Sequence, residues 1–164
     1  MTSEKRYLED FHTGQQFDLG SFRLSEAEII AFATQFDPQV FHTDPVAARE
    51  SAYGGLIASG WHSCSQMMRL LVDNVLANSS SMGSPGFDSL RWLRPVRPDE
   101  KISTTMVVTG VRTSDSKPDR GIVRFEWHAH NDSGEHVAEM KTLCIFGRRS
   151  AAKQPAKQPG EGNA

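Results

Sequence analysis

Apolar positions in the first part of the chain recur at helical spacing. Between Ser25 and Asp37 they define one face of a helix. These residues are Ile29, Ile30, Phe32, Ala33 and Phe36. Ser25 and Glu28 form the pattern of a capping box, which predicts where the helix begins. Pro38 disfavours helical geometry in the residue before it, so the helix is expected to end near Asp37.

Two further helices are expected before the chain turns to strands. A short one can begin after Thr43, with Asp44 as its cap and Pro45 in its first turn, where a missing N–H costs little. The longest helix is predicted to run from about Gly60 to Ala77, with Ser59 as its N-cap. Its apolar residues form the broad stripe of a helix buried against a sheet. They are Trp61, Cys64, Met67, Met68, Leu71, Val72, Val75 and Leu76.

The pattern of the remaining segments predicts strands. An extended segment is expected at residues 17–24, and four runs rich in β-branched and aromatic residues follow the long helix. The runs cover residues 87–96, 101–113, 121–132 and 136–147, with turn residues between them. One early strand, a long helix and four successive strands predict an α+β fold, in which an antiparallel sheet wraps around one helix.

The length fits a single domain. The chain has 164 residues, and no internal boundary is visible over residues 1–150. Residues 151–164 contain a doubled Ala-Lys-Gln-Pro and almost no apolar bulk. Because such a segment cannot offset the entropy of being ordered, we expect it to be a disordered tail.

Charge and composition argue against several classes of partner. The 18 Lys and Arg against 20 Asp and Glu give a formal charge of −2, so nothing favours nucleic acid. The first residues are polar and no stretch is apolar enough to span a membrane, which favours a cytoplasmic protein with no membrane partner. Cys64 and Cys144 show no spacing typical of a metal site, so we expect free thiols and no metal.

An acid and a histidine stand five positions apart in segment 36–45, Phe-Asp-Pro-Gln-Val-Phe-His-Thr-Asp-Pro, on a link between two expected helices. The spacing alone leaves a structural role open, because aspartate before proline often ends a helix. The glycine-led helix that follows and segment 94–102 complete a wider pattern. Together these features resemble the MaoC-like hydratase family, which includes R-specific enoyl-CoA hydratases. The resemblance extends from about residue 10 to residue 147.

The resemblance is most specific at the family signature: Asp, any residue, Asn, Pro, any residue, His, any residue, Asp-Pro. Four signature positions are matched, by Asp37, His42, Asp44 and Pro45. Gln39 stands where the family often has Asn, and Val40 where it often has Pro. The His-Gly that opens the family's central helix falls on Ser59-Gly60, so the glycine is kept and the histidine is not.

The resemblance implies a hot-dog fold and an enzyme that reversibly adds water across the 2,3 double bond of an enoyl-CoA thioester. Asp37 and His42 would bind the catalytic water, with His42 favoured as base and Asp37 as orienter or proton donor. Imidazole suits this chemistry because it titrates near neutral pH. The N–H of Gly60, in the unpaired first turn of the long helix, would hold the charge that forms on the thioester oxygen. The alternative is that Gly60 only allows close helix packing.

Two residues are weaker candidates for substrate contact. Ser59 could approach the acyl group, although capping alone explains it. Arg94 could contact the phosphates of coenzyme A, although surface solubility explains it equally simply. No cofactor is expected beyond the coenzyme A of the acyl-CoA substrate itself.

Other conspicuous residues are interpreted as structural. His62 is expected to be a core or interface histidine, and Trp92 to pack in the core or at a dimer interface. His128 and His130 share one face of a strand, but without a third ligand at useful spacing a solvated face is favoured over a metal site.

Two other functions remain open. A hot-dog thioesterase would commonly draw an acid from the central helix, which here has no carboxylate before Asp73. A non-enzymatic acyl-binding or accessory subunit would fit the departures at Gln39, Val40 and Ser59, but not the intact acid and histidine. We also expect a homodimer or higher homo-oligomer, because a single hot-dog sheet leaves an edge strand uncovered.

Overall fold

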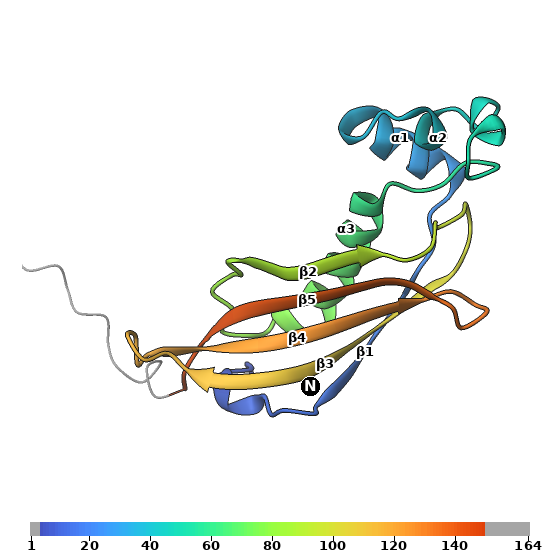
Figure 1. The fold of residues 1–164 in the computed structure, drawn as a ribbon. Coiled ribbons are helices and arrows are strands. Elements are labelled where there is room, and N and C mark those ends of the chain that lie inside the picture. Colours follow the sequence, from blue (N-terminus) through green and yellow to red (C-terminus); the bar gives the residue numbers. More distant parts are fainter. Residues whose placement is uncertain (1–3, 150–164) are drawn as a thin grey trace, which may run out of the picture.

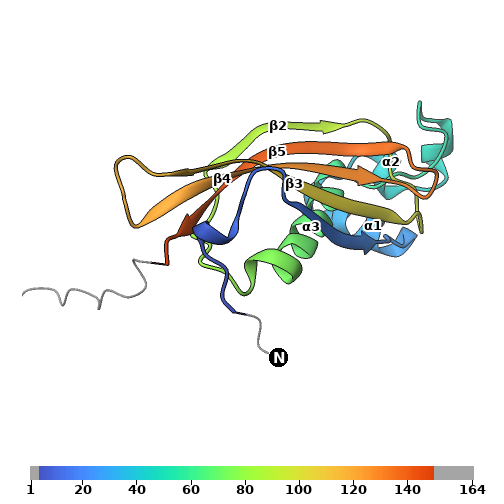
Figure 2. The same cartoon turned by 90° about the horizontal axis from the view of Figure 1, so that it is seen from below.

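The computed structural model describes residues 4–149, so the tail expected at residues 151–164 lies outside the described residues. Five strands form one antiparallel sheet in the order β1-β3-β4-β5-β2. They are β1 (Gln16–Phe22), β2 (Gly86–Trp92), β3 (Ile102–Thr113), β4 (Arg120–His130) and β5 (His136–Gly147). The sheet curves around helix α3 (Gly60–Leu71), which lies on one of its faces (Figures 1 and 2). The α+β hot-dog fold is therefore confirmed.

Helix α1 (Glu26–Phe36) has the predicted boundaries. The hydroxyl of Ser25 accepts the N–H of Glu28 at 3.3 Å, and the Glu28 carboxylate accepts the N–H of Ser25 at 2.8 Å. This reciprocal pair is the expected capping box. The helix ends at Asp37, whose φ of −152° and ψ of 67° lie outside the helical region that a following proline disfavours. Helix α1 lies at the end of the molecule where α3 begins (Figure 1).

The segment after Pro38 differs from the expectation. Instead of an irregular link, it forms the single-turn helix α2 (Val40–Thr43). Gln39 starts this turn, and its carbonyl accepts the N–H of His42 at 2.9 Å. A helix of one turn is too short to leave an apolar period in the sequence, which explains why the pattern did not predict it.

The short helix expected after Thr43 is a 3-10 turn, η2 (Ala47–Glu50). Its N-cap is Val46, two residues after the predicted Asp44. Asp44 Oδ1 nevertheless accepts the N–H groups of Val46 and Ala47 at 2.9 and 3.0 Å, just before the turn begins. A second 3-10 turn, η1 (Leu8–Asp10), precedes β1.

Helix α3 begins where the sequence predicts and changes its winding near its end. Ser59 is the N-cap, and its Oγ accepts the N–H of Trp61 at 3.3 Å. The last turn is a π-helix, η3 (Val72–Leu76). Within this turn the Asn74 amide donates to the carbonyl of Leu19 at 3.0 Å and so ties the helix to β1.

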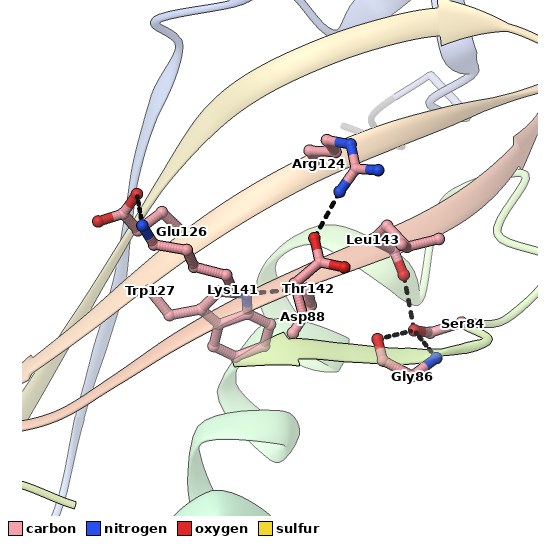
Figure 3. Close-up of polar contacts among 9 residues, drawn as sticks. All are labelled: Ser84, Gly86, Asp88, Arg124, Glu126, Trp127, Lys141, Thr142 and Leu143. Carbon is pink, nitrogen blue, oxygen red and sulfur yellow. Dashed lines mark hydrogen bonds and ion pairs between the residues drawn. The ribbon is translucent and has the colours of Figure 1, made fainter. Parts of the chain in front are cut away.

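The core fills the space between α3 and the sheet. Its largest fully buried side chains include Trp127, Phe125, Phe146, Met67 and Leu71. Alternate residues of β4 and β5 are buried, as expected for strands with one face on a helix. The indole N–H of Trp127 donates to Thr142 Oγ1 at 3.1 Å, which satisfies a buried donor between β4 and β5 (Figure 3).

Cross-strand contacts fix β2 at one edge of the sheet. The Ser84 hydroxyl donates to the carbonyl of Leu143 at 2.6 Å, and Asp88 forms an ion pair with Arg124 of β4 (Figure 3). β2 pairs with β5 and ends at Trp92, opposite Ala138. This register brings the end of β2 to the beginning of α3, where the site lies.

Two remaining expectations concern the cysteines and membrane spans. Both cysteines are free thiols, with Cys144 buried and Cys64 half-buried. Burial raises the pKa of Cys144 to about 11, so this thiol stays protonated at neutral pH. Over residues 4–149, no helix is both long enough and apolar enough to span a bilayer.

Candidate active site

Asp37 lies where α1 ends, and both of its carboxylate oxygens are held by side chains. The amide Nε2 of Gln39 donates to Oδ1 at 2.8 Å. The hydroxyl of Ser59 donates to Oδ2 at 2.8 Å. The carboxylate is thus fixed from two directions, by the N-cap of α2 and by the N-cap of α3.

His42 faces Asp37 from the turn of α2 and is 5% exposed. Its Nδ1 lies 2.8 Å from the carbonyl oxygen of Ile57. Because a carbonyl only accepts hydrogen bonds, Nδ1 carries the proton in neutral His42, and Nε2 keeps a free lone pair. That Nε2 lies 3.4 Å from Asp37 Oδ2. Two acceptor atoms therefore face one another at the same point of the site.

The surroundings of Asp37 favour its ionised form. Burial alone would raise the pKa of this carboxyl, but hydrogen bonds from Gln39 and Ser59 and the neighbouring His42 together hold the pKa below its usual value. Helix dipoles act in both directions, because Asp37 stands at the unfavourable end of α1 and faces the favourable N-terminus of α3. The net result is a carboxylate that remains charged at neutral pH.

Ser59 has a double role that leaves little for a ligand. Its Oγ accepts a hydrogen bond from the N–H of Trp61, and its hydroxyl donates a hydrogen bond to Asp37 Oδ2. The side chain is buried. Ser59 therefore caps α3, as the sequence predicted, and in addition holds Asp37, while its approach to the acyl group stays a prediction.

Gly60 is the first residue of α3 and lines the same pocket as Asp37 and His42. The N–H at this helix position has no partner within the helix, because the residue four positions earlier lies outside it. A β-carbon on Gly60 would lie within 3.0 Å of three atoms of the Trp92 indole, which packs directly on the α-carbon. Close packing and an N–H without a partner inside the helix therefore occur together, so the two interpretations of this glycine do not exclude one another.

The pocket has a volume of about 570 Å³ and lies between α1, α2, the start of α3 and the segment after β2. Asp37 and His42 line one wall with Gly60. Large apolar side chains line much of the remainder and are well exposed in the single chain. They are Phe36, Tyr53, Trp61, Trp92 and Leu93. Polar groups beside a largely apolar lining suit a ligand that carries one reactive group on an apolar body.

Arg94 also lines this pocket. One of its guanidinium nitrogens lies 3.1 Å from a carboxylate oxygen of Glu135. Both side chains are about half exposed, so this ion pair contributes little to stability and can exchange for another anion. The structure therefore brings all five sequence candidates, Asp37, His42, Ser59, Gly60 and Arg94, to one region.

Sequence reasoning missed two contacts of the site. Gln39 was noted only as a departure from the family signature, yet its amide binds Asp37. The Ile57 carbonyl fixes the tautomer of His42 from 15 residues further along the chain. The contact of Gln39 could have been suspected, because a glutamine two residues after an aspartate can reach its carboxylate. No pattern in the sequence predicts that a distant backbone carbonyl binds a histidine ring.

The other conspicuous histidines lie outside this pocket. His62 is buried and stacks on Phe32 of α1, with ring centroids 4.4 Å apart. Its Nδ1 has no hydrogen-bond partner among the described residues, so it is a core histidine but not a fully satisfied one. His128 and His130 lie half-buried on the outer face of the sheet, where His136 joins them. Among residues 4–149, no group of three His, Cys, Asp or Glu side chains is arranged to hold a metal ion.

Comparison with known proteins gives consistent matches. The model of the MaoC like domain family matches residues 10–127. A MaoC-like dehydratase from Rhodospirillum rubrum shares 39% identity at a TM-score of 0.80, over 87% of this chain and 97% of that one. The (R)-hydratase of A. caviae involved in PHA biosynthesis shares 26% identity at a TM-score of 0.69, over 83% of this chain and 97% of that one. The uncharacterized protein YdeM of Bacillus subtilis is 28% identical, over 86% of this chain and 99% of its own length.

Proposed function

The chain belongs to the MaoC-like domain family, and from this we propose that it is a hydro-lyase that reversibly adds water across the 2,3 double bond of an enoyl-CoA thioester. The names of two similar structures, a dehydratase and an (R)-hydratase, support the reaction class. The observation that carries the proposal is the 3.4 Å approach of His42 Nε2 and Asp37 Oδ2 at the wall of the pocket.

These two atoms suit the binding of one water molecule. Neutral His42 presents a lone pair and ionised Asp37 presents a charged oxygen, so each accepts one O–H of the same water. The water oxygen then has its own lone pairs free for attack on C3 of the substrate. Asp37 orients the water, and His42 removes its proton as the new C–O bond forms.

The negative charge that forms on the substrate and the proton held by His42 are both accounted for in this proposal. When the water oxygen bonds to C3, the electrons of the double bond move to the thioester oxygen and form an enolate. Gly60 lines the same pocket, and in this proposal its N–H donates to that oxygen. The enolate then collapses as C2 takes the proton from His42, which restores the neutral imidazole. Dehydration is the same sequence in reverse.

The proposal also includes a contact to the coenzyme A part of the substrate. Arg94 at the pocket margin offers a guanidinium to the phosphates of coenzyme A, once it leaves Glu135. The steps consist of proton transfers and charge stabilisation, so the proposed reaction uses no cofactor beyond the coenzyme A of the substrate. A cytoplasmic location and a homodimer or higher homo-oligomer stay predictions.

The test is to follow the absorbance of the conjugated enone as the protein meets a panel of short, branched and long 2-enoyl-CoA thioesters. We expect the band to disappear for at least part of the panel, without release of free coenzyme A thiol. Release of thiol at the same rate would favour a thioesterase. Binding of acyl-CoA with neither change would favour the acyl-binding or accessory role and would overturn the proposal.

A further inference from the structure

Gln39 lies between the two members of the Asp37 and His42 pair and contacts both. Its backbone N–H donates to the carbonyl of Asp37 at 2.7 Å, and its own carbonyl accepts the N–H of His42 at 2.9 Å. Any residue except proline can make these main-chain bonds. The side chain adds a further donor, because its amide Nε2 lies 2.8 Å from Asp37 Oδ1.

The two carboxylate oxygens of Asp37 therefore have different hydrogen-bond partners. Oδ1 is occupied by Gln39, while Oδ2 receives Ser59 and faces His42 Nε2. A carboxylate can rotate about its last side-chain bond, and a donor on each oxygen removes that freedom. Gln39 thus opposes a rotation that would turn the carboxylate plane away from the imidazole.

We propose that Gln39 is a positioning residue, whose amide holds Asp37 Oδ1 so that Oδ2 stays aligned with His42 Nε2. This inference rests on the proposed function for its catalytic meaning, but the contact itself can be tested without substrate. Asparagine, which the family signature often has at this position, is shorter by one carbon. From the same backbone position its amide would fall short by about 1.5 Å, roughly the length of one C–C bond.

A positioning role makes a specific electrostatic prediction. A donor that binds the ionised carboxylate favours ionisation, so its loss raises the pKa of Asp37. The other titratable groups that line the pocket with this carboxylate are His42 on α2, Tyr53 and Arg94. None of these changes when only Gln39 is replaced. Because the Gln39 side chain is exposed, water can replace part of the lost hydrogen bond, and a moderate shift is expected.

Two substitutions separate length from donor chemistry. Gln39→Asn keeps the amide and shortens the reach, whereas Gln39→Glu keeps the reach and turns the donor into a like charge. Gln35→Asn and Gln35→Glu are matched controls, because Gln35 is an exposed glutamine near the end of α1. Circular dichroism melts establish that all four variants fold.

The first readout is the carboxyl carbon resonance of Asp37, titrated by NMR in the free protein and assigned with Asp37→Asn. We expect its pKa to rise in Gln39→Asn, to rise further in Gln39→Glu, and to stay near the wild-type value in the Gln35→Asn control. The Gln35→Glu control reports how much of the Glu effect is long-range charge. An Asp37 titration that coincides in wild type and Gln39→Asn would overturn the inference.

The second readout is the pH profile of kcat/KM on a 2-enoyl-CoA that the wild type hydrates. The acid limb should move to higher pH in both Gln39 variants, and kcat should fall by about three- to tenfold in Gln39→Asn, with KM nearly unchanged. An Asp37 titration that moves while kcat and the acid limb do not would reject the positioning role. A wild type that hydrates no enoyl thioester would reject the proposed function, while the NMR result would still decide whether Gln39 holds Asp37.

Discussion

The indole of Trp92 packs on the α-carbon of Gly60, so closely that no β-carbon fits between them. Trp92 is the last residue of β2 and Gly60 is the first residue of α3. The ring also meets Trp61 edge to face, with centroids 5.3 Å apart. This contact joins the sheet to the helix end that carries the proposed oxyanion donor, so its disturbance should affect both stability and rate.

Gly60→Ala should lower the free energy of unfolding by about 1–3 kcal/mol, because the added methyl group overpacks the contact with Trp92. The double variant Gly60→Ala with Trp92→Leu should recover most of that loss, since the smaller side chain makes room. Urea unfolding of the four proteins of this cycle measures the effect. Gly110→Ala is the control, because a β-carbon there meets only Arg124 at ordinary contact distance. Equal losses in the single and double variants would show that Trp92 is not the reason for the glycine.

The pH dependence of stability should carry a signature of His62. Burial lowers the pKa of this imidazole, although Glu28 of α1 acts in the opposite direction. Between the ordinary pKa of histidine, about 6.5, and the lower value in the folded protein, the unfolded chain binds more protons at this site. Stability should therefore rise with pH across that window and fall as the solution is acidified.

His62→Phe removes the titration and keeps a ring to stack on Phe32. The melting temperature of wild type should fall relative to that of His62→Phe as pH goes from about 7 to about 5.5. His130 has a lowered pKa of the same sign, caused first by burial and then by His136 and His128, so it contributes a similar slope in both proteins. The exposed His12, changed to Gln, serves as the control. Parallel pH curves for wild type and His62→Phe would contradict the prediction.

Association should bury an apolar stripe that the single chain leaves open. Trp61, Met68 and Val72 are exposed along α3 and its continuation, and Trp61 also lines the pocket. β2 lies at an edge of the sheet, where unpaired backbone groups can pair with another strand. Light scattering at micromolar concentration should therefore show a dimer or a larger homo-oligomer.

Val72→Glu tests this expectation, because it places a charge at the C-terminal end of the stripe. It should weaken the homo-oligomer, whereas Thr105→Glu on the exposed outer face of the sheet should not. A monomeric wild type, or equal dissociation by both variants, would count against an interface on this side of α3.

The sequence predicts those features that depend on local rules. The Ser25 capping box, the helix end before Pro38 and the Ser59 cap all follow from neighbouring residues, and the structure has each of them. Alternating apolar residues likewise locate β4 and β5, because one face of each packs on α3.

The features that sequence could not supply depend on tertiary contacts. The tautomer of His42 is set by Ile57, and Ser59 reaches Asp37 across 22 positions. Trp92 meets Gly60 only because the register of β2 and β5 places it there. The sequence singled out Asp37, His42, Ser59, Gly60 and Trp92 but not Ile57, and the distances between all of them come from the packing of α1, α2, β2 and α3.

The central prediction concerns Asp37 and His42 themselves. Asp37→Asn and His42→Ala should each lower kcat on a hydrated enoyl-CoA by about 10²- to 10⁴-fold, because each removes one of the two groups that act on the water. Asp88→Asn is the control for the acid, since Asp88 lies in an exposed ion pair on the sheet (Figure 3). His12→Ala is the control for the histidine. Melting temperatures of all variants should stay near that of wild type.

The double variant Asp37→Asn with His42→Ala distinguishes a working pair from two separate residues. If both groups bind the same water, the first substitution already abolishes its activation, and the second has little left to remove. The double variant should therefore be scarcely slower than the slower single variant. Losses in kcat that multiply would indicate two independent contributions, such as separate effects on substrate binding and on the fold. If both single variants fold and keep near wild-type turnover, Asp37 and His42 are not part of the catalytic mechanism. The proposed role of Gly60 would then lack the two groups that activate the water.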